Sequence, residues 1–482
     1  MEEEKKLKKT QLFCYNALKI FITVAIILIF ISSVTMLKFN IGNEFDVKLS
    51  ILLGFSLITG IIVIKLNLAI KIKVGLLLLI ALIIRLWWIF NVNSVPVSDF
   101  NTMYLAAKEL LSGNYETFRG FGYLSRFPHL VCTSLYMAFM IKLFPTTHLF
   151  AIKIVNVILS IISLFLLYKL SDYFIKNEKV KLAIILFGAV FPAFIAYSST
   201  YCTENIAIPF FLVTLLLFMN ATKENNVCKW ILCGIMLAIS NLFRTVGIIF
   251  LIAFVIYIFV FTKESKIKNS VIIILLMIGT SFVVSLFLIS NGIIERPLWK
   301  GSEPSFATLM LKGSNVENGG RWNLEDAQFV ESNLGKKELT KMCIEKAMNR
   351  IEELSLKDKI LFFGYKFLSQ WSVGDFSGTY WAFLESGSNL NEVLPVAFQL
   401  IFVVDIFLSF CAMFSKEKNE KSAILYILLC GFGLAFMILE TQSRYSYICS
   451  WIFVILTTQG IENIINWRVK NVKFFRRNNK RT

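Results

Sequence analysis

The sequence is poor in charged residues and in histidine. Only 17% of its 482 residues are Asp, Glu, Lys or Arg, against about 25% in ordinary globular domains, and 56% are apolar. That excludes a soluble enzyme, a disordered regulator and a disulfide-rich secreted module. The two histidines, His129 and His148, argue against a histidine-built metal site. The nine cysteines form neither a CxxC pair nor a metal-like spacing, so we expect small core side chains.

Long apolar runs make up most of the sequence. A helix needs about 20 apolar residues to cross a bilayer. Runs near that length occur at 12–37, 48–66, 73–92, 147–169, 180–198, 203–220, 228–242, 245–262, 269–290, 391–414, 421–440 and 443–463. The sequence therefore predicts an all-α polytopic membrane protein with about twelve spans, within a range of 11–13.

The net charge of +17 does not indicate nucleic acid as a partner, because the Lys and Arg residues lie in short clusters between apolar runs. This is the pattern of positive-inside topology signals. The clusters include Lys8, Lys71, Lys181, Lys266 and Lys418. All of them face one side only if the short run 130–144 does not cross. We therefore expect an interfacial outer helix at 130–144, a location in the cell (plasma) membrane, and both termini in the cytoplasm.

This topology predicts an order of segments along the chain. They are N-terminal transmembrane helices at 1–92, a first outer loop at 93–146, a transmembrane core at 147–290, an outer helical loop domain at 291–390, C-terminal transmembrane helices at 391–463 and a basic cytoplasmic tail at 464–482. Within the loop domain we expect a helix from Asn323, as its cap, to Leu354. Whether this domain is a solvated lid or binds substrate stays open.

Two carboxylates lie at outer edges of apolar runs, and one lies deep inside a run. An ionisable group near the apolar core costs roughly 2.5–3.5 kcal/mol, so it usually has a purpose or a partner. Asp99 follows the run 73–92, and its alternative role is a helix cap. Glu204 lies at the start of the sixth run, and its alternative role is to be stabilised by the dipole of that helix. For Asp405 we favour a hydrogen bond to a neighbouring helix over a proton pathway.

Arginines lie at comparable places. Arg85 is inside the third run, Arg244 interrupts 228–262, and Arg444 opens the last run. Each has an alternative role as an interface anchor. Together with the outer carboxylates they predict a site for an anion and a proton transfer, because the arginine fork suits phosphate and a shielded carboxylate suits a general base.

Several short motifs resemble a known family. Those motifs are Pro96-Val97-Ser98-Asp99-Phe100 with Tyr104, Arg126-Phe127-Pro128-His129, Thr203-Glu204-Asn205, Asn241-Leu242-Phe243-Arg244-Thr245 and Glu440-Thr441-Gln442-Ser443-Arg444-Tyr445. In order and spacing they resemble bacterial GT-C membrane glycosyltransferases of the protein-O-mannosyltransferase-like and aminoarabinose-transferase-like group. The prolines common in that group at the position of Asn205, in the turn at Arg244 and downstream of Tyr445 are missing here. The segment 291–390 is not covered by the resemblance.

The resemblance implies a GT-C-like bundle that moves a sugar from a polyprenyl-phosphate donor to an acceptor hydroxyl on the outer face, with inversion. Asp99 inherits the role of general base. Substrate or phosphate binding falls to Arg85, Tyr104, Arg126, His129, Glu204, Arg244, Arg444 and Tyr445. Some relatives use a divalent metal and others do not; a pair of carboxylates, Asp99 and Glu204, fits Mg²⁺ or Mn²⁺ better than zinc.

Two other classes of function stay open, as do the sugar and the acceptor, which is a polymer, a lipid or a protein. A transporter or flippase of a lipid-linked saccharide predicts ionisable groups at the midplane, where only Asp405 and Arg85 qualify. A membrane scaffold without chemistry predicts that Asp99 and Glu204 can be replaced without effect.

Overall fold

The computed structural model describes residues 2–37, 44–224, 226–263, 265–387, 394–415 and 419–478, and every regular element in them is helical. The α-helices are α1 (Glu2–Thr35), α2 (Glu44–Lys65), α3 (Ile70–Asn91), α4 (Ser98–Leu111), α5 (Tyr123–Arg126), α6 (Val131–Leu143), α7 (His148–Phe174), α8 (Glu178–Val190), α9 (Pro192–Ala196), α10 (Glu204–Glu224), α11 (Val227–Phe243), α12 (Gly247–Phe261), α13 (Lys266–Ser290), α14 (Ser305–Gly313), α15 (Leu324–Ser332), α16 (Leu339–Glu352), α17 (Leu356–Trp371), α18 (Gly378–Ser386), α19 (Val396–Ala412), α20 (Ala423–Ile438) and α21 (Trp451–Asn478). The 3-10 helices are η1 (Glu116–Phe118), η2 (Pro128–Leu130), η3 (Tyr197–Ser199), η5 (Glu420–Ser422) and η6 (Ser443–Cys449).

Seven helices of the described chain are long and apolar enough to cross a membrane, and nine spans result if two bent pairs each count as one. The predicted all-α polytopic fold is therefore confirmed, whereas the count of about twelve is not. Three predicted spans coincide with α11, α12 and α19, whose 17, 15 and 17 residues are short for a full crossing. The run 130–144 forms part of η2 and α6, and its interfacial position stays a prediction.

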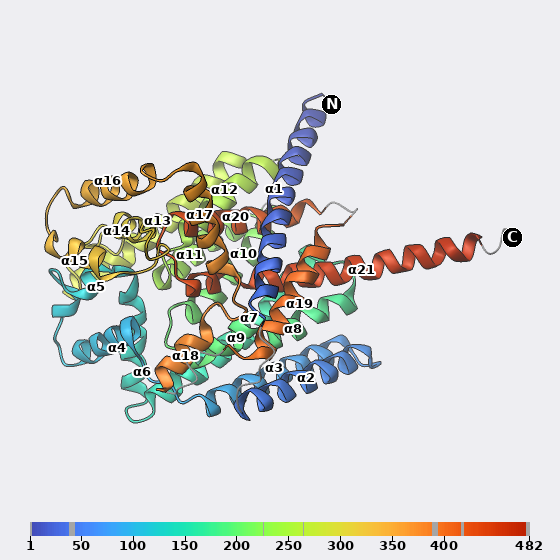
Figure 1. Cartoon of the computed structure of the whole chain (residues 1–482), viewed down its shortest axis with the longest axis horizontal. Coiled ribbons are helices and arrows are strands. Elements are labelled where there is room, and N and C mark those ends of the chain that lie inside the picture. Colours follow the sequence, from blue (N-terminus) through green and yellow to red (C-terminus); the bar gives the residue numbers. More distant parts are fainter. Residues whose placement is uncertain are drawn as a thin grey trace.

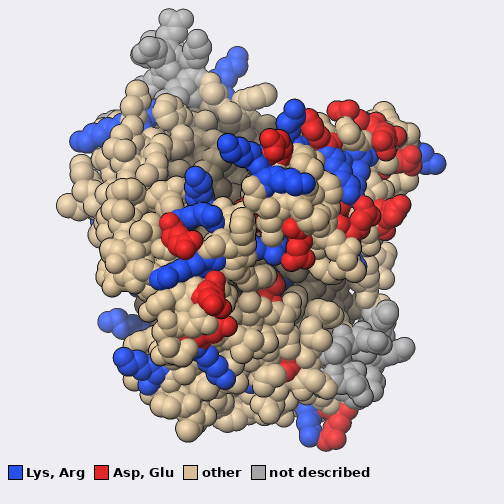
Figure 2. Space-filling view, turned by 90° about the vertical axis from the view of Figure 1, so that its left-hand side faces the viewer, with Lys and Arg blue, Asp and Glu red and all other residues tan. Residues whose placement is uncertain are grey.

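The short helices gather at one end of the bundle. Figure 1 shows α4–α6 and α14–α16 together at the left, and α21 projecting on the opposite side. We call the end that carries α4–α6 and α14–α16 the loop end. Charged side chains of both signs are spread over it (Figure 2). Lys418, and the predicted tail from residue 479 onward, lie outside the described residues.

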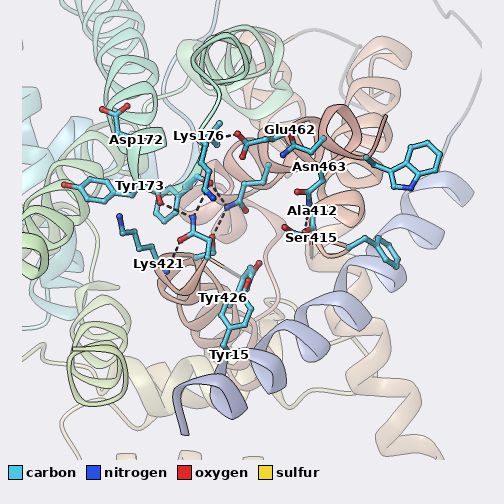
Figure 3. A pocket seen from close by; sticks show the side chains of 18 residues that line it. Tyr15, Asp172, Tyr173, Lys176, Ala412, Ser415, Lys421, Tyr426, Glu462 and Asn463 are labelled. Carbon is cyan, nitrogen blue, oxygen red and sulfur yellow. Dashed lines mark hydrogen bonds between the residues drawn. The ribbon is translucent and has the colours of Figure 1, made fainter. Parts of the chain in front are cut away.

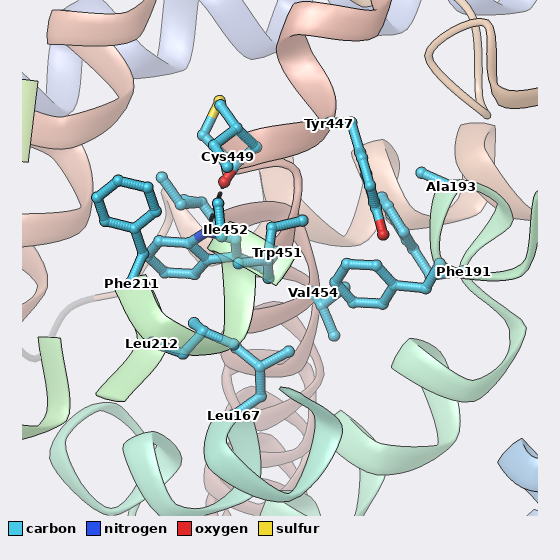
Figure 4. Packing of buried hydrophobic residues seen from close by; sticks show 14 of the residues in the cluster. Leu167, Phe191, Ala193, Phe211, Leu212, Tyr447, Cys449, Trp451, Ile452 and Val454 are labelled. Carbon is cyan, nitrogen blue, oxygen red and sulfur yellow. Dashed lines mark hydrogen bonds between the residues drawn. The ribbon is translucent and has the colours of Figure 1, made fainter. Parts of the chain in front are cut away.

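Two bends bring backbone from the bundle core to the loop end. The pair α8–α9 is bent by 55° at Pro192, and the pair η6–α21 is bent by 58°. Proline lacks the N–H needed to continue the helix, which explains the first break. The bent segments pack on each other: the rings of Tyr197 and Tyr447 stack with centroids 4.0 Å apart, and Phe191 and Trp451 belong to the same buried cluster (Figure 4). This packing fixes the turns that precede Glu204 and surround Arg444.

The loop domain has a small core of its own, made of Ala307, Leu311, Val330, Leu339 and Cys343. The single helix predicted from Asn323 to Leu354 is wrong, because α15 and α16 are separated around Gly335, whose φ of +82° is a left-handed conformation. The cap itself is present: the side chain of Asn323 accepts a hydrogen bond from the backbone N–H of Asp326 at 2.8 Å.

The hydrogen bond expected for Asp405 is also wrong. Asp405 is fully buried in α19, and neither carboxylate oxygen has a hydrogen-bond partner in the described residues. Only its main-chain carbonyl is engaged, by the hydroxyl of Thr457 on α21 at 2.9 Å.

Candidate active site

Asp99 stands at the start of α4, at the loop end. The residue before it, Ser98, has a φ of +50°, an unfavourable backbone conformation for a residue with a Cβ. The N-cap residue is Val97, so Asp99 does not occupy the cap position. Its carboxylate accepts a hydrogen bond from the hydroxyl of Tyr123 at 2.6 Å and is 45% exposed. Asp99 is thus held at one oxygen and open to the surroundings.

Arg444, from η6, is the cation nearest to that carboxylate. Its Nη2 lies 4.0 Å from Oδ2 of Asp99, and the residue is only 5% exposed. The guanidinium lies over the rings of Phe100 and Trp381, 4.8 and 5.0 Å from their centroids. Its Nε and Nη1 have no hydrogen-bond partner in the described residues. A buried guanidinium with unfilled donors is a strong anion-binding group, because unpaired buried polar atoms are costly.

Glu204 and Arg244 form a second pair beside the first. Glu204 is 1% exposed and accepts a hydrogen bond from the hydroxyl of Thr203 at 3.0 Å. Its Oε1 lies 3.4 Å from Nη2 of Arg244, which caps the end of α11. Arg244 also lies over the ring of Tyr445, 4.8 Å from the centroid, and Arg444 lies 5.9 Å from the same ring. Tyr445 therefore separates two arginines whose charges are matched by two carboxylates.

His129, in η2, stands within electrostatic range of all four charged groups. Loss of hydration and the charge of Arg244 lower the pKa of His129 to about 4. The imidazole is therefore neutral near pH 7 and adds no charge of its own to the site.

This pKa leads to a prediction about acid stability. A histidine that titrates at about 4 in the folded chain and near 6.5 when unfolded makes stability fall as the pH drops through that interval, because the unfolded state binds the proton first. We expect the Tm of the wild type to fall more between pH 7 and pH 5 than that of His129→Gln. The measurement is thermal unfolding of both purified proteins at each pH. An equal fall in both would show that His129 titrates normally.

Three residues that the resemblance assigned to the site are engaged by other partners. Arg85 is buried in α3 and donates to Oγ of Ser160 at 2.7 Å and to the carbonyls of Gly188 and Ala189 at the end of α8. It thus satisfies carbonyls that the bend at Pro192 leaves open. The hydroxyl of Tyr104 is hydrogen-bonded to Nε2 of His148, 2.8 Å away.

Arg126 is the third of these residues. Its Nε donates to Glu303 at 2.8 Å, and Glu303 is itself 2% exposed. Arg126 therefore ties the first loop to the loop domain, and its other ion-pair partner, Glu331, lies 3.8 Å away.

Sequence reasoning missed the groups that support the pair. Tyr123 orients Asp99, and burial together with the charge of Asp99 raises the pKa of Tyr123 far above its usual value, so its hydroxyl stays a donor. Trp381, on α18, comes from the segment that no motif covered. Glu440, which belongs to the C-terminal motif, lies 4.0 Å from Lys312, which no motif covered.

The carboxylates of Asp99 and Glu204 are arranged to pair with arginine guanidinium groups and not to bind a divalent metal ion. In the described part of the chain no group of three His, Cys, Asp or Glu side chains is arranged to hold an ion. Asp99 and Glu204, the expected ligands, each face an arginine within 4.0 Å. Like charges so close would oppose a bound Mg²⁺ or Mn²⁺, so the donor set does not fit that expectation.

Comparison with known proteins covers part of this site. The family described as Dolichyl-phosphate-mannose-protein mannosyltransferase matches residues 129–289, which include His129, Glu204 and Arg244. No curated protein matches the sequence. The crystal structure of the Archaeoglobus fulgidus oligosaccharyltransferase in the apo form is similar with a TM-score of 0.45 and 11% identity, over 83% of this chain and 52% of that one. This chain thus spans about half the length of that protein. Over residues 129–289, the family match confirms the predicted resemblance to GT-C membrane glycosyltransferases.

Proposed function

We propose that the chain transfers a sugar from a polyprenyl-phosphate donor to an acceptor hydroxyl, with inversion and with Asp99 as the general base. The observation that carries the proposal is Arg444, a buried guanidinium with two unfilled nitrogen donors, 4.0 Å from the half-exposed carboxylate of Asp99. A base and an anion-binding group side by side are what displacement of a phosphate by a hydroxyl requires.

The proposed transfer is a direct displacement at the anomeric carbon. Asp99 takes the proton of the acceptor hydroxyl, and the oxygen forms a bond to the anomeric carbon from the face opposite the phosphate. The bond between that carbon and the phosphate oxygen breaks, and the electron pair leaves with the lipid phosphate. Arg444 stabilises the charge that builds on this phosphate. Arg244 supports it from the other side of Tyr445, while Glu204 holds Arg244 in place.

The charges at the ends of two helices support a proposal for the side of the membrane. Glu204 begins α10 and Arg244 follows α11, so both stand at the end where Asp99 and Arg444 meet. The opposite ends of these helices carry Lys223 and Lys229. Because lysine-rich connections favour the cytoplasm, we place the candidate site on the outer face of a plasma membrane and the termini inside. The 291–390 loop domain, which supplies Trp381, then covers the site from outside.

A donor panel tests the function. The purified full chain is given polyprenyl-phosphate sugars that differ only in the sugar, with membrane extract as the acceptor, and release of polyprenyl phosphate is measured. We expect release with one donor and an inverted anomeric configuration in the product. A retained configuration would contradict direct displacement. Passage of an uncleaved donor across a vesicle membrane, without phosphate release, would favour the transporter.

A further inference from the structure

A basic hollow lies at the end of the bundle opposite Asp99. Its volume is about 470 Å³, and it is bordered by the ends of α10 and α12, the starts of α11 and α13, and η5. The helix α10 has 21 residues, which makes it roughly 30 Å long, the thickness of a bilayer core. Glu204 and Lys223 stand at its two ends. The hollow and the candidate active site are therefore on opposite faces of the membrane.

The charge of the hollow is positive. Three lysines border it, Lys223, Lys263 and Lys421, against the single carboxylate of Glu420. Within the described residues no carboxylate lies within 4.0 Å of Nζ of Lys223 or Lys421. The neighbouring acid Glu224 is instead paired with Lys229. The side chains of Lys223 and Lys421 are thus not held in an ion pair with any described carboxylate.

One buried amide also faces this space without a partner. Asn269, near the start of α13, is 4% exposed and borders the hollow. Its side chain makes no hydrogen bond to the described residues. Its amide atoms keep some solvent-accessible surface, so a ligand in the hollow can reach them. A side-chain amide in that position offers two N–H donors and one acceptor to a bound group.

The inner wall of the hollow is apolar and aromatic. It is formed by Met219, Trp230, Tyr257 and Phe261, and Trp230 and Tyr257 are almost fully buried. Lys421 lies over the ring of Tyr173, with Nζ 5.5 Å from the centroid. These two residues also border a neighbouring hollow of about 370 Å³, where they lie side by side (Figure 3). An aromatic wall under a rim of lysines is typical of sites at the membrane interface.

We infer that this hollow binds the phosphate group of an anionic lipid on the membrane face opposite the candidate active site. The lysines and Asn269 recognise the phosphate, a chemistry shared with free phosphate. The apolar wall and the position at the ends of membrane-spanning helices identify a lipid as its source. The inference stands apart from the proposed catalytic function and can fail without it.

Native mass spectrometry of the purified full chain tests the inference, with phosphatidylglycerol as the probe and phosphatidylcholine as the neutral comparison. We expect Lys223→Gln/Lys421→Gln to raise the Kd for phosphatidylglycerol about 10- to 30-fold, at about 1 kcal/mol for each lysine. The matched control Lys179→Gln/Lys268→Gln removes two exposed lysines that do not border the hollow and should leave the Kd unchanged. Lys223→Arg/Lys421→Arg should bind like the wild type.

Each other outcome overturns the inference. Equal Kd values in the wild type and the Gln variant, or equal binding of phosphatidylcholine, would remove the site. Displacement of the lipid by millimolar inorganic phosphate would show that the source is soluble phosphate. If the double Gln variant does not fold, the single variants Lys223→Gln and Lys421→Gln replace it, each with an expected loss of about three- to fivefold.

Discussion

Replacing Asp99 by Asn is expected to lower kcat about 10²- to 10⁴-fold, the range that a positioned general base contributes. The amide has the size of the carboxylate and still accepts the hydrogen bond from Tyr123, but it cannot take a proton from the acceptor. Because the carboxylate is 45% exposed, the substitution leaves the core untouched. The measurement is the rate of polyprenyl-phosphate release under saturating donor, with thermal unfolding to show that both proteins are folded.

The control for Asp99→Asn is Glu331→Gln, which removes the same charge at the loop end. Glu331 is 71% exposed, so it should retain wild-type turnover. A loss shared by both variants would indicate an effect of net charge. Equal turnover of Asp99→Asn and wild type would remove Asp99 as the base.

Residues at the ends of apolar runs were the most predictable part of the site. Asp99, Glu204, Arg244 and Arg444 each interrupt or flank such a run, where a charge has few structural reasons to be. The structure brings them together through two ion-pair contacts and the ring of Tyr445. Their catalytic roles remain predictions. Their proximity was predictable because successive spans return the chain to the same face of the membrane.

The residues that did not join the site had local explanations that a sequence does not reveal. Arg85 satisfies carbonyls at a bend more than 100 positions away along the chain. Arg126 meets Glu303, which comes from the loop domain. Trp381 comes from a helix of nine residues without a distinctive pattern. Such long-range contacts depend on tertiary packing, and the hydrophobic periodicity of the sequence does not predict them.

The number of membrane spans could not be predicted from the sequence for a similar reason. The bend at Pro192 and the break before α21 divide two apolar runs that read as continuous, and α12 is only 15 residues long. Hydropathy reports which segments are apolar. It does not report where tertiary packing bends them.

Arg444→Lys is expected to lower kcat/KM for the lipid donor about 10²- to 10³-fold, the range for removing one donor that stabilises developing charge. Lysine keeps the charge but loses the planar fork that stacks on Phe100 and Trp381 and presents two unfilled N–H groups. The ammonium group would also prefer direct pairing with Asp99, which would lower the basicity of that carboxylate. The measurement is donor kinetics at several pH values.

The pH dependence separates a role in phosphate binding from a structural one. If Arg444 holds the phosphate as it leaves, Arg444→Lys lowers kcat more than it raises KM, because charge on the phosphate is greatest in the transition state. If Arg444 only orients Asp99, the closer ammonium lowers the apparent pKa of the base, and the acid limb of the kcat profile moves to lower pH. The exposed Arg321, at the same end of the bundle, gives the control Arg321→Lys, for which neither change is expected. Wild-type kinetics in Arg444→Lys would mean that the fork is not used, and phosphate stabilisation would then have to come from Arg244 alone.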